Sequence, residues 1–362
     1  MTEISLALNY QSIVVITSSK LLENKKKLDL ENKMIIRVKK IFRNNESLFL
    51  RLINDMFFSL YVFYKIILSA KPNDKIFAVT NPPVMLAFLH ILKIIKKLNY
   101  TLLVHDVFPD NIFLNKSKNS KIFINFFQNL FNKFYCSPDL IIAIGHDMRE
   151  YLSKSKNILK SKIKVIPNWF DPKIKESTKN EKSKLRITYG GNIGRMQGLL
   201  DFLKILAQVD GRNNYLLDFY GNGPEKSNLI KFKDKLKLNN LTFHESFKRE
   251  EQSKIFNLTD IALVSLKKGM YGLGVPSKVY NAMASGLPIL YIGDVGSEVD
   301  LYVKEYDIGW SFNWNNTDKL KVFIENISSI DYNLIKKKGQ NSLMLAKNNF
   351  SKKNILKNYQ SL

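Results

Sequence analysis

Short apolar runs alternate with longer stretches of helical periodicity along the whole chain. Runs rich in β-branched and aromatic residues predict strands at residues 12–16, 35–38, 76–79, 101–104, 140–144, 164–166, 186–189, 216–220, 241–243, 261–264 and 288–291. Between them, apolar residues recur at helical spacing, as at residues 202–208, 226–236 and 250–257. This alternation is typical of βαβ units that build parallel sheets, so we expect an α/β fold.

A polar, charged segment at residues 168–184 has the composition of a linker and separates two blocks of similar size. We therefore expect a domain at residues 1–168 and a second at residues 169–345, each doubly wound like a Rossmann domain. Residues 346–362 are basic and helical in composition, and we expect a helix that packs back on the N-terminal domain. Because ligands bind outside the carboxyl ends of such strands, the turns that leave the strands are the candidate sites.

The charge balance indicates an anionic partner without naming it. The chain carries 56 Lys and Arg against 32 Asp and Glu, a net charge of +24. Only eight of these basic residues are arginines, and lysine is the weaker choice for bidentate recognition of bases or phosphates. Cys136 is the only cysteine, which excludes an internal disulfide and fits a reducing compartment.

Neither the N-terminal residues nor the longest apolar stretch predicts a segment inserted in a membrane. The first residues carry no basic leader pattern, so we expect no signal peptide. The apolar stretch at residues 48–70 contains Arg51, Asp55 and Lys65. Each such charge costs about 2.5–3.5 kcal/mol at the centre of a bilayer, so a packed helix is expected there instead.

The sharpest candidate turn is at residues 187–199, where a strand runs into Gly190, Gly191 and Gly194 and then into a helix. Glycines let backbone N–H groups approach a phosphate, and the start of the following helix favours negative charge. Arg195 could add a charge-assisted contact. The alternative is a tight turn that holds no ligand.

A second candidate turn, at residues 274–290, carries a lysine at a helix start. Ser277 is a good N-cap and Gly286 a good residue to end the helix. Lys278 then lies in the first turn, where a cation opposes the helix dipole unless an anion is bound. Lys278 is therefore a candidate phosphate ligand, the alternative being a solvated lysine.

A third candidate turn, at residues 103–111, places His105 and Asp106 at the carboxyl end of a predicted strand. A histidine there can donate to a sugar hydroxyl or phosphate, or exchange a proton with it. The alternative is a histidine held by a local backbone bond.

Together, and in this order, these turns resemble the retaining glycosyltransferases of glycosyltransferase family 4, which have the GT-B fold. The resemblance covers about residues 5–345 and rests on residues 105–109, 165–169, 189–198, 276–280 and 284–288. It implies two Rossmann-like, doubly wound domains with an interdomain cleft. The sequence is most similar to the branch that adds amino or deoxy sugars in O-antigen and capsule assembly.

The resemblance implies an enzyme that moves a hexosyl or N-acetylhexosaminyl group, with retention, from a nucleotide-diphosphate sugar, expected to be a UDP-sugar. The acceptor would be a glycan on a polyisoprenyl diphosphate. The enzyme would be cytoplasmic and peripheral on the inner face of the cytoplasmic membrane, with no nucleic-acid partner. No metal or other cofactor is expected, and the chain contains no Asp-x-Asp motif.

The resemblance also assigns roles to residues. The catalytic side chains would be His105 and Asp106, from the first domain. The residues holding the donor diphosphate would be Gly191, Asn192, Gly194, Arg195, Ser277 and Lys278. Those near the nucleoside and sugar would be Gly221, Asn222, Phe243, Ser246, Tyr280 and Asn281.

The chain departs from the family pattern at three places. In the phosphate turn, the family's common arginine and lysine align with Asn192 and Gln197, which leaves Arg195 as the only cation of that turn. The second of the two glutamates that many members carry aligns with Asn281, and no glutamate occurs in residues 269–280. Residues 4–9 have the pattern of the helix that follows the family's first strand and Gly-rich loop. We therefore expect that strand and loop to be missing, and the chain to be truncated or impaired.

Three other functions stay open. A GT-B nucleotide-sugar epimerase would use the same turns, with His105, Asp106 and His146 as candidate bases. A truncated or non-catalytic glycosyltransferase homologue would keep the fold alone. A basic nucleic-acid-binding protein is disfavoured, because no motif that reads DNA or RNA occurs and the charge is dominated by lysine.

Overall fold

A computed structural model describes residues 4, 13–17, 33–37, 48–71, 74–114, 121–177, 184–211 and 214–362 of the chain. The chain divides into two compact units. Unit 1 comprises Met1–Ile144, Leu152–Ile166 and Leu356–Leu362, and unit 2 comprises Gly145–Tyr151 and Pro167–Ile355. Residues 5–9 of the helix predicted at residues 4–9 lie outside the described residues.

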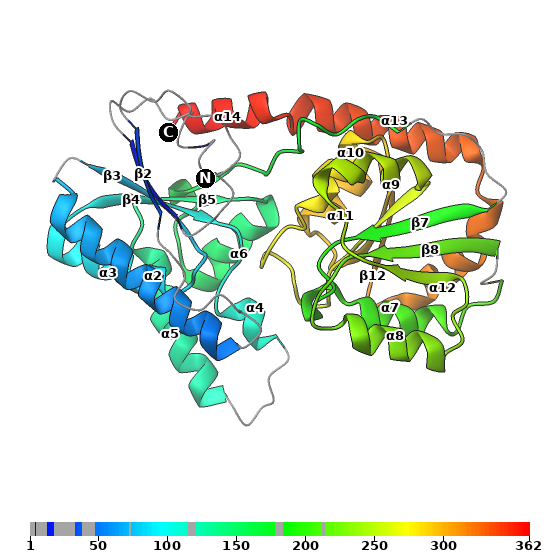
Figure 1. The fold of residues 1–362 in the computed structure, drawn as a ribbon, viewed down its shortest axis with the longest axis horizontal. Helices are drawn as coiled ribbons and strands as arrows, with labels where there is room; N and C mark the ends of the chain where they lie inside the picture. The colour runs from blue at the N-terminus through cyan, green and yellow to red at the C-terminus, as the bar shows by residue number, and fades with distance from the viewer. Residues whose placement is uncertain are drawn as a thin grey trace. The chain divides into compact units, whose positions relative to one another are not determined.

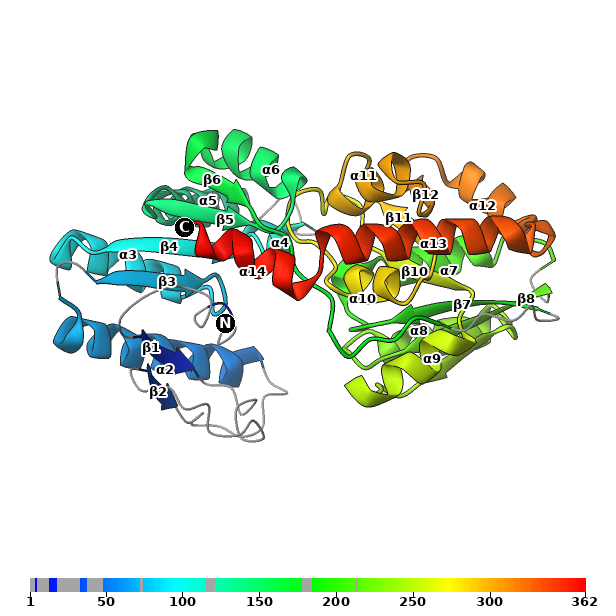
Figure 2. The ribbon, with the colours of Figure 1, turned by 90° about the horizontal axis from the view of Figure 1, so that it is seen from above.

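Unit 1 contains a parallel sheet of four strands in sequence order, β3-β4-β5-β6 (Figure 2). β1 and β2 pair in parallel as a separate two-stranded sheet. The strands are β1 (Ile13–Thr17), β2 (Lys33–Arg37), β3 (Lys75–Val79), β4 (Asn99–Val104), β5 (Leu140–Ala143) and β6 (Ile163–Val165). The helices are α2 (Leu48–Ser69), α3 (Met85–Lys96), α4 (Asp110–Phe113), α5 (Lys121–Cys136) and α6 (His146–Lys156), of which residues 146–151 belong to unit 2.

The core of unit 1 includes side chains of the sheet, α3, α5 and α6. One face of α3 is buried through Met85, Leu86, Leu89 and Leu92, which follow helical spacing. α2 packs against α3, and Phe63 and Phe88 have ring centres 5.3 Å apart. Residues 52–69 of α2 are long and apolar enough to cross a membrane by length and composition, and 17% of them are buried.

Unit 2 contains a six-stranded parallel sheet in the order β12-β11-β10-β7-β8-β9. α7, α8 and α12 cover one face, and α9, α10 and α11 cover the other (Figure 1). The strands are β7 (Leu185–Gly190), β8 (Tyr215–Tyr220), β9 (Leu241–His244), β10 (Ile261–Ser265), β11 (Ile289–Gly293) and β12 (Gly309–Asn313). The helices are α7 (Leu199–Leu206), α8 (Lys226–Lys235), α9 (Gln252–Leu258), α10 (Lys278–Ala284), α11 (Glu298–Glu305), α12 (Thr317–Glu325), α13 (Tyr332–Asn349) and α14 (Lys352–Gln360).

The strand order of unit 2 reverses between β7 and β10, which is the arrangement of a doubly wound sheet. β10 and β11 are buried along their whole length, as expected for inner strands covered by helices on both faces. All eleven predicted strands are confirmed within a few residues. β12 was not predicted, because its five residues carry only Trp310 and Phe312 as large apolar side chains.

The predicted ends of α10 are confirmed. The helix begins at Lys278 after Ser277, although the Ser277 side chain makes no capping hydrogen bond. At its other end Gly286 has φ +71°, its N–H donates to Met283 O, and the N–H of Leu287 donates to Ala282 O. This pair of bonds is a Schellman motif, which needs glycine at the left-handed position. α10 therefore holds Lys278 at a fixed start point.

The C-terminal segment forms two helices rather than one. α13 belongs to unit 2, whereas residues 356–360 of α14 and the two residues after it belong to unit 1. Within unit 1, the ring of Tyr359 lies edge-on to Phe77, with centres 6.1 Å apart, and Lys164 Nζ donates to Ser361 Oγ at 2.8 Å.

Candidate functional site

The Gly-rich turn leaves β7 at the point where the strand order of unit 2 reverses. It is joined to the turn after β8 by backbone bonds: the N–H of Gly191 donates to Tyr220 O at 2.8 Å, and the N–H of Ile193 donates to Asn222 O at 2.9 Å. The N–H groups of Gly191 and Ile193 therefore hold the two turns together and are not available to a ligand. The N–H of Asn192 has no hydrogen bond among the described residues, so it is available to a ligand.

The two turns form part of a pocket of about 200 Å³ in unit 2. Its other walls come from the loop after β9 and from the start of α10. The lining residues are Gly191, Asn192, Tyr220, Gly221, Asn222, Ser246, Phe247 and Lys278. Ligands of open α/β sheets bind at this edge, outside the carboxyl ends of the strands at the reversal.

One wall of the pocket is aromatic. The Tyr220 ring stacks on the His244 ring with centres 4.2 Å apart, and Phe247 meets Tyr220 edge-on at 5.8 Å. Behind them, the buried Asp218 carboxylate lies 2.6 Å from His244 Nε2 and also pairs with Arg186. Asp218 therefore fixes the histidine on which Tyr220 stacks.

Lys278 is the cation of the pocket. Its Nζ lies 6.0 Å from the centre of the Phe247 ring, and none of the described residues forms an ion pair with it. Partial burial lowers the pKa of the Lys278 ammonium below its ordinary value. Lys226 is engaged instead, since its Nζ contacts Asn222 Oδ1, His244 O and Glu245 Oε1 at 2.7–3.0 Å.

Six of the residues predicted to bind the donor line this pocket, and six do not. The lining ones are Gly191, Asn192, Gly221, Asn222, Ser246 and Lys278. Arg195 is not among them: its side chain is 78% exposed, and its Nε lies 3.1 Å from Glu225 Oε1. Gly194 donates its N–H to Gln197 Oε1 at 3.0 Å, and Ser277 is exposed beside Lys278.

The other three predicted residues that do not line the pocket, Tyr280, Asn281 and Phe243, make contacts elsewhere in unit 2. Tyr280 is fully buried and packs edge-on against Phe350. Asn281 Oδ1 accepts from the N–H of Asp171 at 2.8 Å, which ties the linker to α10. The Phe243 ring packs on Phe219 within the sheet.

His105 and Asp106 lie in unit 1, directly after β4. The N–H of His105 donates to Thr80 Oγ1 at 3.2 Å, which fixes the start of this turn. Burial lowers the pKa of the His105 imidazole and raises the pKa of the Asp106 carboxyl. Burial therefore favours the neutral imidazole at His105.

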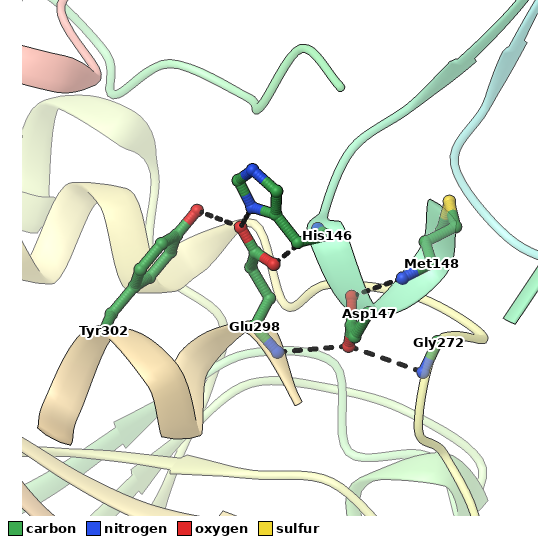
Figure 3. A network of polar contacts seen from close by, with 6 residues as sticks. All are labelled: His146, Asp147, Met148, Gly272, Glu298 and Tyr302. Carbon is green, nitrogen blue, oxygen red and sulfur yellow. Dashed lines mark hydrogen bonds and ion pairs between the residues drawn. The ribbon is translucent and has the colours of Figure 1, made fainter. Parts of the chain in front are cut away.

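A polar network joins α6 to α11 in unit 2 (Figure 3). Both oxygens of the buried Glu298 carboxylate contact His146: Oε2 accepts from its N–H at 2.5 Å, and Oε1 lies 3.0 Å from its Nδ1. Tyr302 donates to the same Oε1 at 2.7 Å. The pairing with Glu298 raises the pKa of the His146 imidazole.

The neighbouring carboxylate, Asp147, binds three backbone segments together. It accepts hydrogen bonds from the N–H groups of Met148, Gly272 and Glu298 at 2.7, 3.3 and 3.1 Å. Burial, together with the nearby Glu298, raises the pKa of Asp147 to about 6. Sequence reasoning missed this network because 151 residues separate Asp147 from Glu298; the one signal was an acidic residue directly after a helix N-cap serine.

Among the residues that the structure describes, no group of three or more His, Cys, Asp and Glu side chains could hold a metal ion.

Comparisons with known proteins identify the class of enzyme. The family model for Glycosyltransferase Family 4 matches residues 10–174, and that for Glycosyl transferases group 1 matches residues 170–342. Probable glycosyltransferase WbjE of Pseudomonas aeruginosa is 29% identical over 299 residues, covering 80% of this chain and 74% of WbjE.

Two solved structures share the fold. WaaG, a glycosyltransferase involved in lipopolysaccharide biosynthesis, superposes with a TM-score of 0.71 at 13% identity, covering 99% of this chain and 94% of WaaG. HepE of Anabaena, solved with UDP-glucose, gives a TM-score of 0.67 at 14% identity, covering 91% and 85%. The chain is therefore a glycosyltransferase with the GT-B fold.

Proposed function

We propose that this GT-B glycosyltransferase takes its sugar from a nucleoside diphosphate sugar, and that the pocket of unit 2 binds the donor. The observation that carries the proposal is Lys278, a cation without an ion pair among the described residues, in a pocket that also exposes the Asn192 turn and an aromatic wall. A lysine without an ion-pair partner beside a free backbone N–H is a good receptor for a diphosphate, because hydrogen bonds to a charged group are stronger than those between neutral groups.

The same groups would act on the reaction itself. Cleavage of the bond between the sugar and the diphosphate leaves extra negative charge on the leaving oxygens. Lys278 and the N–H of Asn192 would stabilise that charge as it develops, which lowers the barrier. The leaving phosphate can then accept the proton of the incoming hydroxyl, so transfer with retention needs no protein base beside it.

The aromatic end of the pocket suits a nucleoside. Tyr220 and Phe247 offer apolar ring surface, and Asn222 Nδ2 and Ser246 Oγ lie 3.3 Å apart with polar atoms that can read a base or ribose. We assign uridine to this end, supported by HepE, which has the same fold and was solved with UDP-glucose. Among donors, we favour those of amino or deoxy sugars.

For the acceptor we propose a glycan on a polyisoprenyl diphosphate, at the inner face of the cytoplasmic membrane. Unit 1 exposes large apolar side chains on α2, α3 and α5, among them Leu68, Ile94, Ile95 and Phe126. Lys96 lies on α3 next to Ile94 and Ile95, whereas Lys93 is paired with Asp139. Basic residues close to anionic lipid contribute about 1 kcal/mol each, so this face would hold the enzyme at the membrane as a peripheral protein. WaaG, a glycosyltransferase involved in lipopolysaccharide biosynthesis, shares the fold.

We assign catalytic roles in unit 1 to His105 and Asp106. The neutral imidazole that burial favours at His105 can donate or accept a hydrogen bond at a sugar hydroxyl without adding charge. Their place directly after β4, at the carboxyl end of the strand, is the observation that supports this assignment.

A binding and transfer experiment tests the proposal. UDP should raise the unfolding temperature of the full chain, whereas duplex DNA should not. A panel of UDP-sugars with a polyisoprenyl-diphosphate glycan should then give a longer lipid-linked product together with free UDP. An epimerase would convert the UDP-sugar without an acceptor, and that outcome would replace the proposed function. No binding of any nucleoside diphosphate would refute it.

A further inference from the structure

Glu298 holds His146 more tightly than an exposed side chain requires. The His146 side chain is 57% exposed, yet Glu298, only 1% exposed, places both of its oxygens on this one residue. A buried carboxylate is stable only when its oxygens are well hydrogen-bonded, and here the donors are the two N–H groups of His146 and the Tyr302 hydroxyl. The buried Glu298 carboxylate therefore fixes the orientation of the exposed His146 imidazole.

The pair of hydrogen bonds from His146 to Glu298, called the clamp below, determines which ring nitrogen faces outward. Because Glu298 accepts from Nδ1, this nitrogen carries a hydrogen; in the imidazolium form Nε2 carries one as well and is left free to donate it. Figure 3 shows Nε2 turned away from Glu298, and within the described part of the chain no hydrogen bond reaches it. A carboxylate that orients a histidine through Nδ1 and presents Nε2 is the arrangement of histidines that bind substrates or metals.

The start of α6, which carries His146, is bonded to the loop that leads into the donor pocket. Asp147, the residue after His146, accepts a hydrogen bond from Gly272, and Asp294 accepts from the N–H groups of Gly269 and Tyr271 at 3.1 and 2.9 Å. Five residues separate Gly272 from Lys278, so these two positions lie at most about 22 Å apart. This loop follows β10, at the same edge of the sheet as the pocket.

The donor sugar is bonded to the phosphate, so it must lie close to the groups that bind the diphosphate. We propose that His146 Nε2 binds a hydroxyl or amide oxygen of the transferred sugar, with Glu298 as the residue that positions it. This inference rests on the proposed function, because it takes Lys278 and Asn192 as the diphosphate site. It assigns recognition of the sugar, as distinct from the nucleoside diphosphate, to a residue outside the pocket.

A merely structural role for His146 makes a different prediction. The clamp also joins α6 to α11, so removing the imidazole affects stability in either case. Only a sugar-binding role changes the affinity for the donor relative to the affinity for UDP, which lacks the sugar. The ratio of these two affinities is therefore the decisive quantity.

The experiment compares UDP, UDP-glucose and UDP-N-acetylglucosamine by calorimetry on the full chain. His146→Ala should weaken binding of the preferred UDP-sugar by about ten-fold or more, the loss expected for one hydrogen bond to a charged group. The affinity for UDP should stay within about two-fold, because His146 does not line the pocket. The preferred sugar shows whether His146 binds a hydroxyl or an amide oxygen, since only the N-acetyl sugar carries an amide.

Two further variants keep the test sharp. His146→Gln keeps an N–H donor at the end of the side chain and should recover part of the lost affinity. Glu298→Gln should raise KM for the UDP-sugar more than it lowers kcat, because it loosens the ring without removing Nε2. Glu305→Gln, the same change on the exposed side of α11, is the matched control and should behave like the unmodified protein.

Each outcome has a definite meaning. Equal weakening of UDP and UDP-sugar by His146→Ala, or no weakening of either, overturns the role of His146 while leaving the donor pocket in place. If the unmodified protein binds neither UDP nor any UDP-sugar, the proposed function fails first, and the sugar assignment fails with it.

Discussion

A Cβ atom on Gly221 would lie 1.8 Å from the carbonyl oxygen of Gly191. The turns that follow β7 and β8 pass each other at this point, and the N–H of Gly191 donates to Tyr220 O beside it. Gly221 also has φ +153°, which side chains rarely adopt. Both turns line the pocket, so the lack of a side chain at Gly221 sets the shape of the donor site.

Gly221→Ala should therefore destabilise the protein and impair nucleotide binding together. Overpacking costs about 1–3 kcal/mol and a strained φ adds to it, so we expect a loss of roughly 2–4 kcal/mol in the free energy of unfolding. Chemical denaturation measures this loss. Gly190→Ala is the control, because its Cβ would meet Phe247 at an ordinary 3.4 Å. Similar stability of the two variants would contradict the packing argument.

Lys278→Ala should weaken the binding of UDP by about ten-fold, since a hydrogen bond to a charged group contributes about 1.5–3 kcal/mol. Arg195→Ala should have a smaller effect, because Arg195 is exposed and paired with Glu225 outside the pocket. Titration calorimetry at fixed salt gives both values. Lys254→Ala, an exposed lysine on α9, controls for the loss of a positive charge. An Arg195 effect as large as that of Lys278 would mean that the arginine reaches the diphosphate.

His105→Ala should lower kcat more than it raises KM, if the imidazole acts on the reacting sugar. Because burial lowers the pKa of His105, the enzyme should keep its activity from neutral pH upward and lose it as the imidazole becomes protonated in acid. A steady-state pH profile with a saturating UDP-sugar measures both effects. Full activity of the variant would reduce His105 to a structural residue.

The contact between His146 and Glu298 should make stability depend on pH. Glu298 raises the pKa of His146, so the folded state holds the proton more tightly than the unfolded chain. This contribution is fully present below the ordinary histidine pKa and is lost as the pH rises through the raised value. The pKa of Asp147, raised to about 6, shifts stability in the same direction.

To isolate the histidine, the unfolding temperature of His146→Ala should be compared with that of the unmodified protein at about pH 6 and about pH 9. The difference between the two proteins should be larger at the lower pH. A difference that is the same at both values would show that protonation of His146 does not stabilise the fold. Asp147 is present in both proteins, so its own titration largely cancels.

A buried ion pair in unit 1 should contribute strongly to stability. Lys156 Nζ lies 2.6 Å from Asp110 Oδ2, and the two side chains are 2% and 8% exposed. Lys156→Met leaves the Asp110 carboxylate buried without its cation, with Gln128 as its remaining side-chain donor. We expect a loss of about 3–5 kcal/mol in the free energy of unfolding.

The exposed pair of Lys204 and Asp201 provides the control, since Lys204→Met should cost less than about 1 kcal/mol. Denaturant titrations of both variants make the comparison. Asp110→Asn combined with Lys156→Met should recover part of the loss, because no charge is then left buried. Equal effects of the two lysine substitutions would contradict the role of burial.

Local patterns predicted most of the fold because they act within a few residues. The strands from β3 to β11 follow from apolar runs, and the ends of α10 follow from Ser277 and Gly286. β12 was not predicted because its five residues have a weak strand pattern, and its pairing with β11 holds it in the sheet. The same limit applies to the site: Tyr280 and Asn281 follow Lys278 directly along α10, yet they face Phe350 and Asp171 rather than the pocket.

The sequence by itself determined the α/β class, the order of the candidate turns and the lysine at the start of α10. These features depend on local propensity, capping and the spacing of glycines, which short segments express on their own. Only the tertiary structure decided that Lys278 has no ion pair within the described residues while Arg195 has one, and that Glu298 meets His146 across 152 residues of chain. The reason is that burial and electrostatic partners are set by parallel-strand crossovers, which join residues that no local pattern relates.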